Sequence, residues 1–303
     1  MNKIDDIKNN LIETGVKDFT CNIKWFLIDI CNYNCSYCIS HWYNNNQFKE
    51  LNKSNKIKTT EKLVIAKLKK FPKKFKMELT GGEPILHPRL FEIAKEISSI
   101  NNCEVIKIFS NFSEDPKLFA KYKDISKITW IFSYHSEYTT LDEFLNKLEI
   151  LSNLMDSKRS DDKIHININM FQVSQDELKI IKKHSLNKKM TFHINYLANT
   201  DIFEIIYDKE DFDTDVENEP KIPFITNNNT YLLTHKDITH YNLQKFSKPR
   251  MCQSNNYLIR LDGEFTHACL EFHMPLNGPK DNYYCEIPEC GCILDADIYK
   301  KIL

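Results

Sequence analysis

The sequence predicts an α/β protein that is built on a parallel β-sheet. Apolar runs of strand length alternate with amphipathic segments of helix length through residues 25–197. This alternation is typical of parallel sheets with right-handed crossovers. Beyond residue 250 the alternation stops, and the pattern of a β-hairpin follows. We therefore expect an α/β core followed by a smaller C-terminal unit.

Six strands are predicted from short apolar runs or from period-two alternation. The clearest case has Phe75, Met77 and Leu79 alternating with polar residues. The predicted strands are Trp25–Ile30, Phe75–Thr80, Glu104–Phe109, Lys127–Tyr134, Lys163–Phe171 and Met190–Leu197.

Helix-start signals fall between these strands. Two of them have Ser or Thr three residues before Glu, which is the capping-box pattern. In a third, an aspartate precedes a proline, which suits an N-cap followed by the first helical position. The predicted helices start at Thr60, Pro88, Asp115, Thr140 and Ser174.

Composition and charge exclude several classes of protein. The 303 residues include 41 basic and 42 acidic ones, and the formal net charge is -1. That balance gives no reason to expect nucleic acid or a membrane as a partner. Only six glycines are present, without a G-x-G-x-x-G or Walker A pattern, which excludes the usual dinucleotide and P-loop sites. The N-terminal MNKIDDIKNN is charged where a signal peptide is apolar. We therefore expect a cytoplasmic protein.

The ten cysteines are clustered rather than scattered. In a reducing cytoplasm, clustered thiols indicate metal binding or catalysis. Cys31, Cys35 and Cys38 form one group, whereas Cys21 and Cys103 stand apart and are predicted to be buried apolar residues. The second group consists of Cys252, Cys269, Cys285, Cys290 and Cys292.

The first cysteine group has the spacing Cys-x3-Cys-x2-Cys and follows the first predicted strand. Because a [4Fe–4S] cluster normally takes four protein ligands, three thiolates leave one iron open to a substrate. The alternative is a zinc site in which His41 supplies the fourth ligand. Both interpretations fit this spacing.

A second motif, Gly81-Gly82-Glu83-Pro84, directly follows the second predicted strand. The glycines allow the backbone to approach a ligand closely. The carboxylate of Glu83 can accept a hydrogen bond from a cationic amine, and backbone groups can bind a carboxylate, so an amino acid moiety suits the motif. On its own, the motif is interpreted first as an ordinary turn.

Together the two motifs resemble those of the radical S-adenosylmethionine (SAM) superfamily, including the aromatic Tyr37 before the last cysteine. The resemblance covers about residues 24–200. It implies a partial (β/α)6 barrel of the TIM type, with the site at the C-terminal ends of the strands. It also implies that Cys31, Cys35 and Cys38 hold a [4Fe–4S] cluster and that its open iron binds SAM.

The resemblance assigns SAM contacts to further residues. The SAM amine would be held around Gly81–Glu83, beside Pro84, and the backbone of Tyr37 would meet adenine. Strand ends would supply contacts to the ribose and carboxylate, from Ser110, Asn111, Ser133 and His135. Further polar candidates are Asn167, Asn169, His193 and Asn195, for which a role in barrel-core hydrogen bonding is the alternative. The glycine-containing motif that many members carry on strand five is absent.

The second cysteine group resembles the auxiliary-cluster extensions called SPASM and twitch domains. Cys252 and Cys269 flank a predicted hairpin with an Asp262-Gly263 turn, and a Cys-x4-Cys-x-Cys run follows. Five cysteines are fewer than a full SPASM domain carries and suit the shorter twitch form. Four of them would hold a second [4Fe–4S] cluster, with Cys285 as the weakest candidate. A structural zinc site is the alternative.

The resemblance implies an oxidoreductase-like enzyme. An external one-electron reductant, such as flavodoxin or ferredoxin, would drive cleavage of SAM to a 5′-deoxyadenosyl radical, which would abstract hydrogen from a substrate. A small-molecule or sugar-type substrate is favoured because Phe132–Glu137 and the C-terminal cysteine run are similar to members near polysaccharide and natural-product gene sets.

Two other functions remain open. One is a maturase of a ribosomally made peptide, although the roughly 23 residues before the first strand are too few for a leader-binding domain. The other is a zinc-stabilised binding protein without enzymatic activity.

The expected organisation has four segments. They are an N-terminal extension at 1–23, a radical SAM core at 24–200, a linker at 201–250 that contains the acidic run Asp208–Pro220, and an auxiliary-cluster domain at 251–303.

Overall fold

A computed structural model gives the arrangement of the chain. The residues it describes divide into two compact units, one formed by residues 24–214 and 260–263 and the other by residues 1–23, 215–259 and 264–303. The described ranges are 2–15, 20–38, 55–155, 164–169, 173–188, 190–195, 221–243, 250–254, 256–268, 273–275, 283–285 and 298–302.

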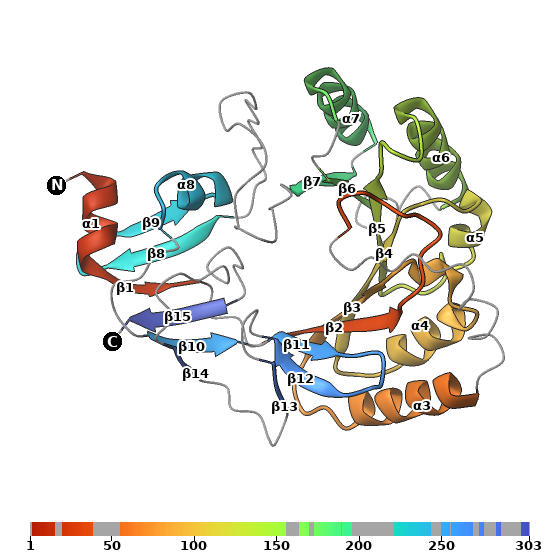
Figure 1. The fold of residues 1–303 in the computed structure, drawn as a ribbon, viewed down its shortest axis with the longest axis horizontal. Coiled ribbons are helices and arrows are strands. Elements are labelled where there is room, and N and C mark those ends of the chain that lie inside the picture. Colours follow the sequence, from red (N-terminus) through yellow and green to blue (C-terminus); the bar gives the residue numbers. More distant parts are fainter. Residues whose placement is uncertain are drawn as a thin grey trace. The chain divides into compact units, whose positions relative to one another are not determined.

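The first unit, here called the core unit, is organised around a parallel sheet (Figure 1). Its strands lie in chain order from β2 to β7, and from β3 onward each pairs with the next in parallel. They are β2 (Cys21–Ile28), β3 (Phe75–Gly81), β4 (Cys103–Ser110), β5 (Ile128–Tyr134), β6 (Ile164–Asn169) and β7 (Thr191–Asn195). This arrangement confirms the predicted partial (β/α)6 barrel.

Helices connect the strands and cover one side of the curved sheet (Figure 1). They are α3 (Asn55–Lys69), the short 3-10 helix η1 (Pro84–Leu86), α4 (Leu90–Ser98), α5 (Pro116–Ala120), α6 (Leu141–Leu154) and α7 (Gln175–Asn187). Both predicted capping boxes are formed, at Thr140 and Ser174, and Asp115 caps α5 as predicted. Local capping chemistry therefore sets where these three helices begin.

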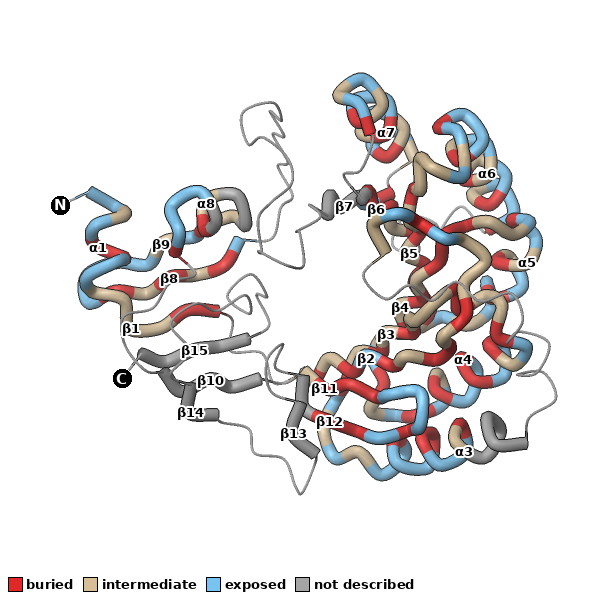
Figure 2. The backbone as a smooth tube through the Cα atoms, viewed as in Figure 1, coloured by how far each residue is buried: buried red, intermediate tan, exposed pale blue. Residues whose placement is uncertain are grey.

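Burial alternates along the strands, as the period-two pattern predicts (Figure 2). In β3 the buried side is formed by Phe75, Met77 and Leu79, which are fully enclosed. The two isolated cysteines, Cys21 and Cys103, are buried as predicted. Aromatic rings pack around the ends of β4 and β5, namely Phe112, Phe119, Trp130, Phe132 and Phe144.

The other unit, here called the terminal unit, contains an antiparallel sheet in the order β14-β10-β15-β1-β8-β9. Its strands are β1 (Leu11–Thr14), β8 (Ile222–Thr226), β9 (Thr230–Leu233), β10 (Arg250–Ser254), β14 (Tyr283–Cys285) and β15 (Ile298–Ile302). Helix α1 (Lys3–Asn10) and helix α8 (His235–His240) complete this part. Ile7, Phe224 and Ile238 belong to its small apolar core.

The predicted C-terminal hairpin is formed, but its connection is longer than the predicted primed turn at Asp262-Gly263 and runs from Arg260 to Glu264. Strands β11 (Asn256–Ile259) and β12 (Phe265–Ala268) pair antiparallel, and β13 (His273–Pro275) pairs with β12. The turn residue Gly263 has a φ of 81°, which favours glycine.

Regular structure also occurs inside residues 201–250, the segment expected to be a linker. Strands β8 and β9 and helix α8 lie there, whereas the acidic run Asp208–Pro220 is outside the described residues. The alternation of Ile222 and Phe224 with half-buried neighbours is the signal for β8. Among the described residues, we find no helix with both the length and the apolar composition needed to cross a bilayer.

Candidate functional site

The first cysteine group occupies an irregular loop, residues 31–38, which begins shortly after the end of β2 at Ile28. The Cys38 amide donates to the carbonyl of Cys35 at 3.1 Å, and the Tyr33 amide donates to Cys31 Sγ at 3.4 Å. Burial is the main reason that the pKa of Cys31 rises to about 11 and that of Cys35 to about 12, and neighbouring thiols contribute. Without a bound cation, these two sulfurs are therefore protonated at neutral pH.

Two glycines bring the second motif against the start of this cysteine loop. The amide of Gly82 donates to the Ile28 carbonyl at 2.8 Å, and the amide of Glu83 donates to the Ile30 carbonyl at 2.7 Å. A Cβ atom at Gly81 would stand 2.1 Å from the Ile28 oxygen, and one at Gly82 would stand 2.0 Å from the Ile30 oxygen. Only glycine allows this backbone approach. The structure thus brings together two motifs that lie far apart in the sequence.

The Glu83 side chain is enclosed and already satisfied by backbone groups. Its Oε2 accepts from the Asn111 amide at 2.5 Å, and its Oε1 accepts from the Ile85 amide at 3.1 Å. Burial raises the pKa of Glu83 to about 7, against the lowering effect of those hydrogen bonds. In this structure the carboxylate therefore binds the backbone at the end of β4 and at the start of η1.

Asn111 connects the second motif with the cysteine loop. Its backbone amide reaches Glu83, while its side-chain Nδ2 donates to Asn32 Oδ1 at 2.8 Å and lies 3.8 Å from Cys31 Sγ. Asn32 in turn donates to Ser113 Oγ at 2.8 Å. Asn32 was not identified from the sequence, although it lies inside the cysteine spacing.

The loop after β4 is held in an unusual conformation. Phe112 has a φ of 55°, which is rare outside glycine. The Lys147 ammonium group on α6 donates to the carbonyls of Phe112 and Ser113 at 3.0 and 2.7 Å. The hydroxyl of Ser110, a predicted SAM contact, accepts from the Phe112 amide at 3.1 Å. Ser110 therefore shapes this loop in the structure.

His135, at the end of β5, lies against the cysteine loop. Its Nδ1 is 3.4 Å from Cys35 Sγ and 2.6 Å from the Tyr37 hydroxyl. Burial lowers the pKa of His135 to about 4, so its ring is neutral at physiological pH. Nδ1 can then accept a hydrogen bond from the Tyr37 hydroxyl when the other ring nitrogen carries the imidazole hydrogen.

The remaining strand-end candidates meet in register across β5, β6 and β7. Ser133 is opposite Asn167, and Asn167 is opposite His193. Asn167 Nδ2 lies 3.3 Å from Ser133 Oγ and donates to it. Asn169 pairs with Asn195. The side chains of Asn169, His193 and Asn195 lie outside the described part, so only Ser133 and Asn167 are brought into contact there.

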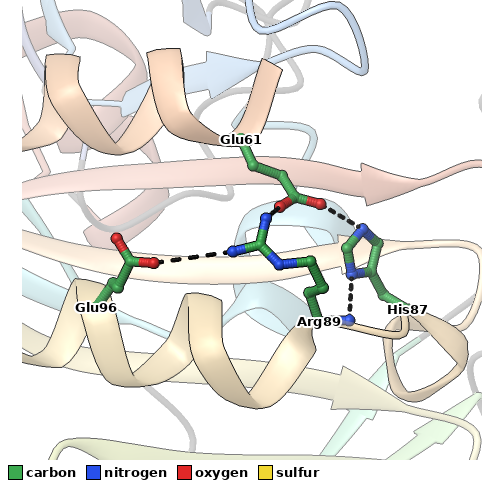
Figure 3. Close-up of polar contacts among 4 residues, drawn as sticks. All are labelled: Glu61, His87, Arg89 and Glu96. Atoms are coloured by element: carbon green, nitrogen blue, oxygen red, sulfur yellow. Dashed lines mark hydrogen bonds and ion pairs between the residues drawn. The ribbon is translucent and has the colours of Figure 1, made fainter. Parts of the chain in front are cut away.

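A buried ion-pair network anchors the segment that follows the GGEP motif (Figure 3). Glu61 on α3 is buried, and its Oε1 lies 3.1 Å from His87 Nε2. Arg89 donates to the other oxygen of Glu61, and the Arg89 amide donates to His87 Nδ1 at 3.2 Å. Arg89 also lies 3.9 Å from the half-exposed Glu96. No local sequence pattern identified this network, because its partners come from separate elements.

In the terminal unit, two cysteines of the second group lie on neighbouring strands. In the pairing of β10 with β14, Arg250 is opposite Cys285 and Cys252 is opposite Tyr283. Cys252 and Cys285 are therefore two register positions apart. Cys269, Cys290 and Cys292 lie outside the described residues.

Comparison with known families identifies the core unit. A sequence model of the Radical SAM superfamily matches residues 25–191, which is more than half of the chain and includes both motifs. The chain belongs to the radical SAM superfamily. Members of this superfamily are enzymes, and the family implies a [4Fe–4S] cluster and SAM.

Similar proteins agree with this radical SAM assignment. GTP 3′,8-cyclase of Microcystis aeruginosa is 33% identical over 86 residues, which are 28% of this chain and 25% of that protein. 7-Carboxy-7-deazaguanine synthase of Clostridium acetobutylicum is 29% identical over 178 residues, covering 54% of this chain and 68% of that protein. Against the cyclase, this radical SAM chain therefore spans only about a quarter of its relative's length.

A solved structure shares the fold of this radical SAM protein. It is SuiB of Streptococcus suis bound to SAM, with a TM-score of 0.52 and 14% identity, covering 87% of this chain and 63% of SuiB. At that level of identity, the likeness concerns the fold alone.

The residues of the cysteine loop suit the cluster that the radical SAM family implies. The loop carries three thiols whose charges influence one another, and glycine backbone adjoins it without side chains. Within the described ranges, no three His, Cys, Asp or Glu side chains gather around the position of one metal ion. Each cysteine ligand of an iron–sulfur cluster binds its own iron atom, so the thiolates of a cluster stand apart.

We expect Glu61→Gln to lower the free energy of unfolding of the cluster-free protein by about 2 kcal/mol, because it leaves Arg89 without its buried carboxylate partner. Urea unfolding followed by circular dichroism measures this loss. Glu96→Gln is the matched control, since Glu96 meets the same arginine at 3.9 Å and is 46% exposed. It should change the free energy by less than about 0.5 kcal/mol. Equal effects of the two variants would contradict the buried pair.

Stability should also depend on pH through Glu83. Its pKa is 4.5 in the unfolded reference and about 7 in the folded protein, so the protonated carboxyl stabilises the fold below pH 4.5, and this contribution is lost as pH rises through 7. Between these values, unfolding free energy should fall by about 3 kcal/mol more in the wild type than in Glu83→Gln. Urea unfolding across this range gives both curves.

Glu92→Gln, on the exposed side of α4, serves as the control and should follow the wild-type curve. Parallel curves for the wild type and Glu83→Gln would show that Glu83 titrates as an ordinary carboxyl.

Proposed function

We propose that this protein is a radical SAM enzyme that abstracts hydrogen from a small-molecule or sugar-type substrate, with oxidation or epimerisation as the net reaction. Cys31, Cys35 and Cys38 hold the [4Fe–4S] cluster. The observation that carries the proposal is the junction of the cysteine loop with Gly81 and Gly82, where both backbones meet without intervening side chains.

The bound cluster and SAM supply the chemistry, which is reductive cleavage of SAM to methionine and a 5′-deoxyadenosyl radical that takes hydrogen from the substrate. The chain's own residues bind and orient. Three thiolates leave one iron without a protein ligand, which gives the SAM amine and carboxylate a place to bind. The half-buried backbone at Gly81 and Gly82, beside Pro84, suits the amine, and the Tyr37 backbone suits adenine.

Other candidates divide into two roles. Asn111, Ser133 and His135 present polar groups next to the cysteine loop or on the neighbouring strand ends, which suits SAM ribose and carboxylate contacts. Glu83 and Ser110 instead bind backbone amides of the surrounding loops. We propose that Glu83 and Ser110 hold these loops in place and that the backbone around them contacts SAM directly.

The small-molecule assignment is supported by the names of the relatives. GTP 3′,8-cyclase and 7-carboxy-7-deazaguanine synthase both denote chemistry on small molecules. A peptide substrate is the second candidate, because SuiB shares the fold and has been solved with its precursor peptide SuiA. A zinc-stabilised binding protein without enzymatic activity is the third.

A second [4Fe–4S] cluster in the segment 251–303 is part of the proposal. Its supporting observation is the closeness in register of Cys252 and Cys285 on β10 and β14. Four of the five cysteines at positions 252, 269, 285, 290 and 292 would ligate it, which makes this segment a twitch or SPASM-type domain. A closed cluster of this kind suits electron transfer from the substrate, while structural zinc is the alternative.

The remaining assignments follow from the same proposal. An external one-electron reductant such as flavodoxin or ferredoxin supplies the electron. The near-zero net charge favours neither nucleic acid nor a membrane as a partner, and clustered thiols favour the cytoplasm. We place the SAM core at 24–200, preceded by an extension at 1–23 and separated by 201–250 from the auxiliary domain.

Cys35→Ala should abolish reductive SAM cleavage, lowering 5′-deoxyadenosine formation with dithionite more than about a hundredfold, because one of three cluster ligands is lost. Chromatographic quantification of 5′-deoxyadenosine in anaerobically reconstituted protein is the measurement. The matched control is Cys103→Ala, which removes a buried cysteine at the start of β4 and should retain cleavage. Undiminished product from Cys35→Ala would show that this loop does not hold the active cluster.

Metal content separates the radical SAM enzyme from the zinc-stabilised binding protein. Anaerobically purified protein should contain about eight irons and eight acid-labile sulfides per chain, four of each per cluster. Elemental analysis and a sulfide assay measure both. About four irons would contradict the auxiliary cluster alone. Zinc in place of iron would contradict the enzyme and favour the binding protein.

A further inference from the structure

The loop that connects β5 to α6 contacts almost every residue between the first and last cysteines of the cysteine loop. Residues 135–138, here called the support segment, come directly after β5. They meet residues 33–37 through hydrogen bonds and ring contacts. About a hundred positions of sequence separate the two segments, so only the fold brings them together.

Two of these contacts take the backbone amides on either side of Cys35. The Asn34 amide donates to the Tyr138 hydroxyl oxygen at 2.7 Å. The Ser36 amide donates to Glu137 Oε2 at 2.9 Å, a hydrogen bond strengthened by the carboxylate charge. An irregular loop lacks the backbone hydrogen bonds that satisfy amides in a helix or sheet, so these side chains supply the acceptors instead.

Ring contacts reinforce the same arrangement. Tyr33 stacks on Tyr138 with centroids 4.2 Å apart and planes within 8° of parallel. His135 lies edge-on to Tyr33 at 5.6 Å and touches both Cys35 Sγ and the Tyr37 hydroxyl. Cys35 is therefore fixed by its backbone neighbours and by the ring beside its sulfur.

The support segment is itself held in one conformation. The amides of Tyr138 and Thr139 both donate to the His135 carbonyl, at 3.0 and 3.2 Å. The next residue, Thr140, begins the capping box of α6. A tight turn between a strand end and a capped helix is a rigid base, which is what precise placement of a ligand requires.

We propose that Glu137 and Tyr138 are positioning residues for the cluster, because they fix the backbone on both sides of Cys35. The inference rests on the proposed function, in which Cys35 is a cluster ligand. Neither residue touches the reacting atoms. Their removal loosens one thiolate while leaving the other two ligands and the glycine junction intact, so the cluster still assembles and is retained less well.

The test compares four variants of the full chain after anaerobic reconstitution. Glu137→Ala removes the acceptor of the Ser36 amide, and Glu137→Gln keeps an oxygen that accepts from it. Tyr138→Phe removes the acceptor of the Asn34 amide and keeps the ring stack. Asp142→Asn, exposed in the first turn of α6, is the control for a lost charge near the segment.

Two measurements report on the cluster without relying on turnover. The rate of iron release to a chelator, followed by absorbance, should rise about tenfold in Glu137→Ala and Tyr138→Phe. The electron paramagnetic resonance spectrum of the dithionite-reduced protein should also change in these two variants. Asp142→Asn should match the wild type in both measurements, Glu137→Gln should lie much closer to the wild type than Glu137→Ala, and circular dichroism should show all four variants folded.

Unchanged iron release and spectra in Glu137→Ala and Tyr138→Phe would overturn the positioning role and leave the proposed function standing. Equal effects of Glu137→Gln and Glu137→Ala would also overturn it, since the hydrogen bond would not be the cause. A wild-type chain that takes up no iron–sulfur cluster would overturn the proposed function, and this inference with it.

Discussion

The close approach of the Gly81–Gly82 backbone to the carbonyls of Ile28 and Ile30 is the constraint on which the rest of the site depends. It joins the end of β3 to the residues that lead into the cysteine loop. No other residue fits at either position, because a Cβ atom would overlap a carbonyl oxygen of the adjoining strand. The cysteines therefore begin at a fixed point of the sheet edge, although their own loop has no regular structure.

From this junction, a chain of polar contacts runs across three strand ends. The Glu83 carboxylate accepts a hydrogen bond from the Asn111 amide. The Asn111 side chain donates to Asn32 and lies next to Cys31 Sγ. Lys147 secures the same loop from α6. The side chains of Glu83, Asn111 and Asn32 thus have protein partners before any ligand binds. Such preorganisation reduces the ordering that binding a cofactor would otherwise require.

Local signals in the sequence were sufficient to predict the strands and helices of the core unit. They were insufficient to predict its contacts between segments that lie far apart in the sequence. Capping boxes and period-two burial predicted α6, α7 and β3, because those signals act within a few residues. The cysteine loop and the GGEP motif were predicted to adjoin because the C-terminal ends of neighbouring strands meet. The backbone partners of Glu83 could not be predicted from the sequence, because they depend on the position of Asn111.

Contacts between distant segments explain what the sequence did not reveal. Glu137 and Tyr138 meet the cysteine loop from about a hundred residues away, and Glu61 meets His87 and Arg89 across two elements. Hydrophobic periodicity in the sequence does not indicate which distant residues form such pairs. The same holds for β1, a four-residue strand whose partners β8 and β15 lie more than 200 residues further along the sequence.

The pairing of β1 with β15 has a consequence for the order in which the protein assembles during synthesis. Lys301 and Lys300, the partners of Glu13 and Thr14, are made more than 280 residues after them. The consecutive strands β3 to β7 are neighbours in the sheet, so that sheet can grow as the chain emerges. The terminal sheet has a high contact order, so it cannot form until its later strands have been made. Until β8 and β15 have been made, β1 has neither of its strand partners, and its exposed edge depends on chaperones for protection.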